Sequence, residues 1–538
     1  MLRHKELIEK MSLEDLASQI LCQEIYDYDD PEKIEKKLAD LKPGSLFVTD
    51  MSPEKIKMYT DMANKYSVTP VMVASDIEYG PETAIKNSGY FPHPMAWGAC
   101  NDEGLIEQAG RISAQISRKA GVHWTFSPVV DINFNYNSPE CNIRSVSDNP
   151  ERVIKIAGAF LKGLQTDNLM AAAVKHFPGQ GVDDRSTHFV TTINTLSKEE
   201  WMNSYGKVYK KMFEMGAMSV MIGHIGLPCF DDEVEENFGV LPACFSKNLL
   251  TNLLKGELGF KGCVVSDAMT MIGACSRIDS DKEVPVRYLN AGGDVILFPE
   301  PGDAKSIVDG VKSGKLPLER LQDAVDRFLS LKEQVGLLKE NNPQFESSIV
   351  VEDTVSNVAA KIADKSITLV RNYKNIIPKD IKKGSKVLVL GVFEPYFQRK
   401  PTGKEFAPLI DEFEKYGAKV DYIFNAQYDE IQNILPEYDL VVAACKMSSA
   451  DYHGGTLRLG WNHVMVFWRA YSLRHPNFVL VSFGDPYKLY DLPYLHEYIN
   501  AYSFAPESQR AAAKVIMGKI EPQGKSPVGL KGFFERQD

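Results

Sequence analysis

The feature that most constrains the fold is an alternation of short apolar runs with longer helical stretches, which begins at Ser45 and continues to about residue 340. The runs have the length of buried strands, and helical stretches such as 102–120 lie between them. This βαβα order is typical of a parallel sheet covered by helices. The strands that it predicts lie at 45–48, 70–76, 123–126, 170–175, 219–223, 262–266 and 294–298.

Polar residues collect repeatedly just after these predicted strands. In a (β/α)8-type TIM barrel the loops at the carboxyl ends of the strands form the active site, so we predict an α/β fold of this type with its site in these loops. A doubly wound sheet would show the same alternation. It would also need a Gly-rich phosphate loop after the first strand, and the sequence has none there.

The chain of 538 residues is long enough for two or three domains. After a Lys-rich helical stretch and a loop at 341–344, residues 354–371 favour a helix followed by a strand. Four further apolar runs indicate a second, smaller parallel α/β domain, and they lie at 385–392, 419–425, 439–446 and 477–484. We therefore expect a barrel at 1–345, a linker and connecting helix at 346–372, and an α/β sandwich domain at 373–538.

Composition excludes several classes of protein. The 61 basic and 72 acidic side chains give a net charge of −11, which argues against nucleic acid or a membrane surface as the main partner. The N-terminus has no apolar signal-peptide core and the eight cysteines have no CxxC spacing, so we expect a cytoplasmic protein with reduced thiols. The ten histidines are dispersed, and we expect no metal or other cofactor. The oligomeric state stays open.

Residues 175–188 read KHFPGQGVDDRSTH and follow the apolar run 169–174. Lys175 and His176 therefore stand where a buried strand ends, and Gly179 and Gly181 start a loop that carries His188. A solvated turn after a structural strand would have the same composition. A second loop favours the functional interpretation.

That second loop ends the predicted strand at 262–266, where the chain reads GFKGCVVSD and places Asp267 at the strand end. An aspartate in this position is often a helix cap, and 268–271 could begin a helix. Together, the two loops resemble glycoside hydrolase family 3, in particular its β-N-acetylglucosaminidase (β-hexosaminidase) branch. That branch has a K-H-F-P-G-H-G loop ending in D-x-H and a G-F-x-G-V-V-x-S-D strand.

Further segments carry the same resemblance. Asp76 in VASDIEYG is similar to the aspartate of the family's D-x-E-G-G loop, although the second half of that motif differs here. Residues 126–133 resemble its F-A-P-V-x-D-x-N strand, and Arg144, shortly before Asp148, resembles the arginine of its R-S-F-G-x-D-P turn. The resemblance implies a carbohydrate substrate and sugar contacts from Asp76, Arg144, Lys175 and His176.

The resemblance also implies the catalytic roles. Glycosidic cleavage builds positive charge at the anomeric carbon and negative charge on the departing oxygen, so the site needs an anion and a proton donor. Asp267 would be the nucleophile, ionised at neutral pH, and His188 the acid/base. The covalent intermediate then leads to retention of configuration.

One position departs from the family's pattern, because Ser186 stands where the branch has the aspartate that orients the catalytic histidine. A serine hydroxyl can accept a hydrogen bond from the ring but supplies no charge. Three interpretations stay open: Asp183 or Asp184 supplies the carboxylate of an ordinary hydrolase, His188 acts unaided in a phosphorylase, or the barrel is a degenerate sugar binder. The substrate implied by the branch is a terminal β-linked N-acetylglucosamine, and the alternative is a β-glucosidase-like or β-xylosidase-like activity.

Overall fold

The structure is a computed structural model, and it describes residues 2–236, 238–275, 284–339, 349, 351, 353–393, 401–431, 433–449, 459–472 and 475–538. The chain divides into two compact units. The first comprises Met1–Tyr90, Ile106–Asp131 and Ala157–Val355, and the second comprises Phe91–Leu105, Ile132–Ile156 and Ser356–Asp538. These units are discontinuous in sequence, unlike the consecutive domains expected at 1–345 and 373–538, and those limits stay a prediction. The expected linker loop at 341–344 lies outside the described residues.

The described part of the first unit contains an eight-stranded sheet whose strands follow one another around a barrel in chain order. Every pair in this sheet is parallel, and the last strand pairs with the first. A parallel bridge between Val265 and Val295 joins the two remaining edges and closes the circle. The predicted (β/α)8-type TIM barrel is confirmed, and closure excludes a doubly wound sheet. The strands are β1 (Leu21–Ile25), β2 (Ser45–Val48), β3 (Met72–Ser75), β4 (Trp124–Thr125), β5 (Ala171–Phe177), β7 (Ser219–Ile222), β11 (Cys263–Ser266) and β12 (Ile296–Leu297).

Each strand predicted in this half overlaps a barrel strand, but the sequence analysis missed β1. Helix α2 (Leu13–Gln19) ends only two residues before this strand begins, so its apolar residues run on into the apolar residues of β1 without an intervening polar turn. A pattern read along the chain therefore extends the helix. The pairing of β1 with β2 and β12 decides its conformation.

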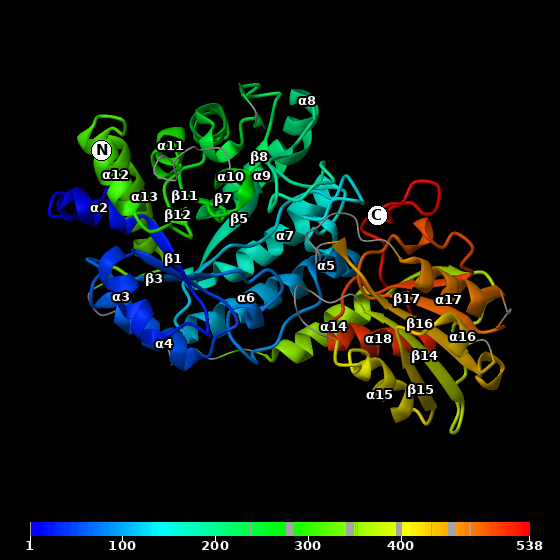
Figure 1. The fold of residues 1–538 in the computed structure, drawn as a ribbon. Coiled ribbons are helices and arrows are strands. Elements are labelled where there is room, and N and C mark those ends of the chain that lie inside the picture. Colours follow the sequence, from blue (N-terminus) through cyan, green and yellow to red (C-terminus); the bar gives the residue numbers. More distant parts are fainter. Residues whose placement is uncertain are drawn as a thin grey trace. The chain divides into compact units, whose positions relative to one another are not determined.

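The barrel helices lie outside the strands (Figure 1). Two of them begin at clear N-cap residues. Asp30 caps α3 and Ser52 caps α4, each side chain accepting a backbone N–H of the first turn, and a proline follows each cap. None of the helices in the described ranges is both long and apolar enough to span a lipid bilayer. The longer helices are α3 (Pro31–Leu41), α4 (Pro53–Asn64), α6 (Glu103–Lys119), α7 (Pro150–Leu164), α9 (Lys207–Glu214), the π-helix η6 (Asn248–Glu257), α11 (Val284–Ala291), α12 (Asp303–Lys312) and α13 (Leu318–Gln334).

The described part of the second unit is built on a six-stranded sheet in the order β13-β18-β17-β16-β14-β15. Only β13 runs antiparallel to its neighbour. Its strands are β13 (Thr368–Asn372), β14 (Lys386–Phe393), β15 (Lys419–Phe424), β16 (Leu440–Lys446), β17 (Phe478–Ser482) and β18 (Glu497–Asn500), and its longer helices include α14 (Val355–Ser366), α15 (Ala407–Lys415), α17 (Trp461–Ser472) and α18 (Pro506–Ile516). The predicted smaller α/β sandwich domain is confirmed.

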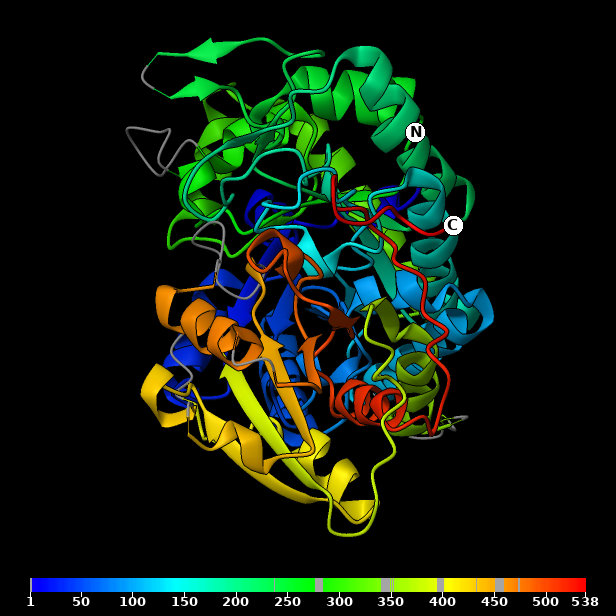
Figure 2. The ribbon, with the colours of Figure 1, turned by 90° about the vertical axis from the view of Figure 1, so that its right-hand side faces the viewer.

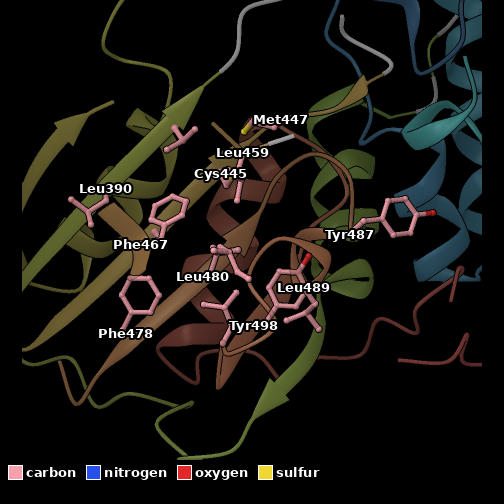
Figure 3. Packing of buried hydrophobic residues seen from close by; sticks show 14 of the residues in the cluster. Leu390, Cys445, Met447, Leu459, Phe467, Phe478, Leu480, Tyr487, Leu489 and Tyr498 are labelled. Carbon is pink, nitrogen blue, oxygen red and sulfur yellow. The ribbon is translucent and has the colours of Figure 1, made fainter. Parts of the chain in front are cut away.

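Alternate residues of these strands supply two separate apolar cores, one on each face of the sheet, as the two-residue period of a strand requires. On one face Leu390, Cys445 and Leu480 pack with Phe467 of α17 and with Phe478 (Figure 3). The other face packs against α15 and α18. Figure 2 shows α17, in orange, and α18, in red, on opposite sides of the yellow and orange strands.

Candidate active site

Lys175 lies near the end of β5, where its ammonium is buried between two carboxylates. Its Nζ is 2.7 Å from Oδ1 of Asp76 and 2.8 Å from Oε1 of Glu78. Only 4% of the Lys175 side chain is exposed, against 42% of the Asp76 side chain. Asp76 and Lys175, both predicted to bind a sugar, are therefore in contact, and the ammonium fixes a carboxylate that still faces solvent.

His176 is oriented by Asp131, a fully buried residue shortly after β4. Nδ1 of His176 is 2.7 Å from Oδ2 of Asp131, and the other carboxylate oxygen accepts hydrogen bonds from the backbone N–H groups of His176 and Gln180 at 3.2 and 2.8 Å. Because a carboxylate accepts, Nδ1 carries the proton in this contact. The ring orientation of His176 and the start of the glycine loop therefore depend on one carboxylate.

Asp267 follows β11 directly, as predicted, and is only partly accessible to solvent. Burial alone would raise the pKa of its carboxyl, but groups that can carry positive charge outweigh burial and hold the pKa below the usual value of an aspartic acid. In order of effect these groups are His176, His224 and Lys175, and the backbone N–H of Ala268, at 2.8 Å, adds to them. The carboxyl is thus kept as an anion, the form that a nucleophile requires.

His224 is a buried residue of this cluster that the sequence analysis missed. Its Nε2 donates to the carbonyl oxygen of Ala268 at 2.9 Å, and its Nδ1 lies 3.4 Å from the thiol of Cys244. Burial is the main reason that the pKa of His224 is lowered. The sequence feature that could have identified His224 was its position directly after the predicted strand 219–223. Its hydrogen bond places it next to Ala268, the residue that follows Asp267.

The loop that carries His188 begins at two glycines in left-handed backbone conformations, with φ of 118° at Gly179 and 108° at Gly181. Oγ of Ser186 is 3.2 Å from Nδ1 of His188, and it also accepts the backbone N–H of His188 at 3.2 Å. The positive form of His188 lowers the pKa of His224, which is itself influenced by Asp267. His188 and Asp267 therefore both influence the pKa of the same buried histidine.

Asp183 was a candidate for orienting His188, and its carboxylate is used elsewhere in the same loop. Oδ1 accepts from Nε of Arg185 at 2.9 Å, and Oδ2 accepts from NH2 of Arg185 at 2.6 Å and from the N–H of Ile193 at 2.8 Å. Burial would raise the pKa of Asp183, but these bonds lower it overall. Asp184 is exposed. Among the contacts described for His188, the one with Ser186 can orient its ring.

Arg144, predicted to touch the sugar, belongs to the second unit. It lies in a short 3-10 turn, where its NH1 is 3.1 Å from the carbonyl oxygen of Glu140 and 3.5 Å from Oε2 of the same residue. Its predicted role is not tested by these contacts. Across the described residues, no group of three or more His, Cys, Asp or Glu side chains is arranged to hold a metal ion.

Comparison with known proteins decides the family. The model described as the N-terminal domain of glycosyl hydrolase family 3 matches residues 13–331. This chain belongs to glycosyl hydrolase family 3. Within this family it is similar to a β-N-acetylglucosaminidase/β-glucosidase of Cellulomonas fimi, with 28% identity over 545 residues that cover 97% of this chain and 94% of that protein. β-Hexosaminidase A of Pseudoalteromonas piscicida is 28% identical over 336 residues, which cover 57% of this chain and 54% of that protein.

Solved structures also match almost the whole chain. A β-glucoside phosphorylase, BglX, bound to 2FGlc has a TM-score of 0.87 at 26% identity and covers 98% of this chain and 95% of its own. A β-N-acetylglucosaminidase from Paenibacillus sp. str. FPU-7 has a TM-score of 0.82 at 23% identity, covering 97% and 99%, and shows the shared fold. The chain is a family 3 glycosidase whose relatives bear hexosaminidase, glucosidase and phosphorylase names. The roles of its individual site residues stay predictions.

Proposed function

We propose that this family 3 protein cleaves a terminal, non-reducing β-linked N-acetylglucosamine from its substrate with retention of configuration. The observation that carries the proposal is the Asp267 carboxyl, kept anionic at a barrel strand end beside a loop that carries His188. The names of the curated relatives support the choice of sugar.

The reaction has two steps. Asp267 attacks the anomeric carbon while the glycosidic C–O bond breaks, and His188 gives its proton to the departing oxygen. In the second step the acceptor, which is water in hydrolysis, attacks the anomeric carbon from the face that the leaving group vacated. The bond to Asp267 breaks, and His188 takes up the acceptor's proton. Lys175, His176 and Asp76 are proposed to hold the sugar hydroxyls, and a sugar contact from Arg144 stays a prediction.

Variants of the two catalytic positions test this mechanism. Asp267→Gly should lower kcat by roughly 10^4-fold, and added azide should restore turnover and give the glycosyl azide of inverted, α configuration. His188→Ala should lose roughly 10^2-fold to 10^4-fold on poor leaving groups and far less on a 2,4-dinitrophenyl glycoside, which needs little acid help. Unchanged turnover of 4-nitrophenyl β-N-acetylglucosaminide by Asp267→Gly would remove the proposed nucleophile.

A second candidate, phosphorolysis, is favoured by Ser186. The hydroxyl beside the catalytic imidazole carries no negative charge that would repel a phosphate acceptor, and phosphate, already an anion, needs little deprotonation to attack. Similarity to a β-glucoside phosphorylase over nearly the whole of both chains supports it. Turnover with and without phosphate separates the two, because only phosphorolysis releases a sugar 1-phosphate, here of retained β configuration.

A further inference from the structure

Three apolar side chains are exposed on the two segments that carry the proposed nucleophile and acid/base. Phe189 is 53% exposed and Val190 37% exposed, and both follow His188 directly. Ile272, 49% exposed, begins the short helix α10 (Ile272–Cys275), a few residues after Asp267. Exposed apolar side chains that gather in one place commonly mark a binding site.

The two segments lie directly against each other. A Cβ atom at Gly273 would lie 2.9 Å from the carbonyl oxygens of both Thr187 and Val190, so only glycine allows this approach. The hydroxyl of Thr191 donates to the carbonyl oxygen of Gly273 at 3.0 Å. The apolar side chains of the loop and of Ile272 therefore belong to adjoining stretches of backbone.

The loop makes further hydrogen bonds, both within itself and to Gln180. Nε2 of the buried Gln180 donates to Oγ1 of Thr187 at 3.3 Å, and the carbonyl oxygen of Ser186 accepts the backbone N–H groups of Phe189 and Val190, both at 3.1 Å. The exposed side chains thus stand on a backbone with defined hydrogen bonds.

The chemistry of the proposed function says what passes this place. His188 must reach the oxygen of the scissile bond, so the aglycone attached to that oxygen extends past His188. The Cα atom of Phe189 is about 3.8 Å from that of His188, as for any consecutive residues. A flat apolar surface there can be covered by the C–H face of a pyranose ring or by an aryl group.

Resting on the proposed function, we infer that Phe189, Val190 and Ile272 form the leaving-group subsite and bind an aglycone with a flat apolar face. Val190 and Ile272 supply aliphatic surface, and Phe189 supplies the ring on which the aglycone stacks. The site therefore selects its substrate on the leaving-group side as well as through the sugar hydroxyls.

Three donors of the same sugar test this subsite: the β-glycosyl fluoride, which has no aglycone, the 4-nitrophenyl glycoside, with an aryl aglycone, and chitobiose, with a second sugar ring. Phe189→Ala should raise KM by roughly fivefold to twentyfold for both of the latter and leave kcat/KM for the fluoride within about twofold. Comparison of the 4-nitrophenyl glycoside with chitobiose shows which of the two aglycones depends more on the ring of Phe189.

Matched variants complete the experiment. Ile272→Ala, on the other segment, should change KM in the same direction, Phe189→Leu should recover part of the loss, and Tyr373→Ala, which removes a 66% exposed aromatic side chain of the second unit, should change nothing. Equal losses on all three donors would show that Phe189 acts by positioning His188, and they would overturn the subsite. Unchanged KM values, or a dimer that Ile272→Ala dissociates without changing KM, would overturn it as well. A wild type inactive on all three donors would refute the proposed function itself.

Discussion

At the scale of single residues, the site depends on which side chains surround each titratable group. Asp267 has a lowered pKa because His176, His224 and Lys175 outweigh its burial. His188 has a serine hydroxyl at 3.2 Å, at the place where the branch has an aspartate. Charged groups therefore surround the proposed nucleophile, and a hydroxyl group contacts the proposed acid/base.

Ser186→Asp tests the neutral partner of His188. A carboxylate next to the ring stabilises the imidazolium, so the basic limb of the pH–rate profile should move to higher pH, by roughly one unit, and the rate on poor leaving groups should rise. If phosphate is an acceptor, its share of the product should fall, because the new charge repels it. Ser186→Asn, which is similar in size and neutral, is the control and should leave the basic limb in place.

Lys175→Met tests the electrostatic support of Asp267. Because Lys175 is among the groups that lower the pKa of Asp267, its loss should raise that pKa and move the acid limb of kcat/KM to higher pH, by about half a unit to one unit. The variant also leaves Asp76 and Glu78 without their shared ammonium, so we expect the free energy of unfolding to fall by about 2–5 kcal/mol.

Glu78→Gln is the matched control for that pH shift. It removes a negative charge from the same cluster, so the acid limb should stay in place or move to lower pH. A shift of both variants in the same direction would show that changes in packing, and not charge, control the acid limb.

At the scale of secondary-structure elements, Lys332 of helix α13 is buried against two segments, one that precedes β1 and one that precedes β3. Its Nζ donates to Oγ1 of Thr69 at 2.8 Å and to Oε1 of Gln19 at 3.4 Å, and it lies 4.8 Å from the ring centroid of Phe328. All of these partners are neutral. Burial lowers the pKa of Lys332 from 10.5 to about 7.

This lysine makes stability depend on pH. Between about pH 7 and pH 10.5 the unfolded chain binds a proton at Lys332 that the folded chain does not. The free energy of unfolding therefore rises with pH through this window. Below about pH 7 the folded chain must bury the charged lysine, and the cost is greatest there. Lys332→Met should therefore raise the free energy of unfolding by roughly 1–3 kcal/mol at pH 6 and by less at pH 9. Thr69 and Gln19 keep a partner without the lysine, because the hydroxyl of Thr69 donates to Oε1 of Gln19 at 2.6 Å in the native chain.

Denaturation in urea at pH 6, 7.5 and 9 measures this dependence. Lys305→Met, which changes a surface lysine of α12, is the control and should shift stability by no more than about 0.5 kcal/mol at any pH. If the gain in the free energy of unfolding on Lys332→Met substitution is smaller at pH 6 than at pH 9, the pH dependence does not come from this residue.

At the scale of the whole molecule, the second unit is assembled from parts that are distant in sequence. Met95, Ala96 and Ala99 of α5 (Pro94–Cys100) and Ile143 are buried in the same apolar core as the strands β14, β16 and β17. The chain therefore cannot be cut after the barrel half without uncovering this surface.

A fragment of residues 1–345 tests the discontinuity of the unit. It retains Met95 and Ile143 but lacks the strands that bury them, so we expect it to aggregate or to unfold at a lower temperature than the full chain. Met95→Ser with Ile143→Ser should improve the solubility of the fragment and destabilise the full chain. A monomeric fragment that melts at the temperature of the full chain would contradict this expectation.

Local pattern was enough to predict much of this fold and of the candidate site. Buried parallel strands are continuous apolar runs, and polar residues stand at or just after their carboxyl ends, so both β5 with Lys175 and β11 with Asp267 could be recognised along the chain. The strand β1 was missed because its apolar residues continue those of α2, and only pairing with β2 and β12 distinguishes them.

The amino-acid sequence by itself determined the alternation of strands and helices, the polar strand ends and the family motifs, because each of these depends on residues close together in the chain. Only the tertiary structure decided that Asp131 orients His176, that His224 influences the pKa of Asp267 and that Gly273 receives the His188 loop. These contacts join residues whose spacing in sequence obeys no local period, and the closed barrel brings them together.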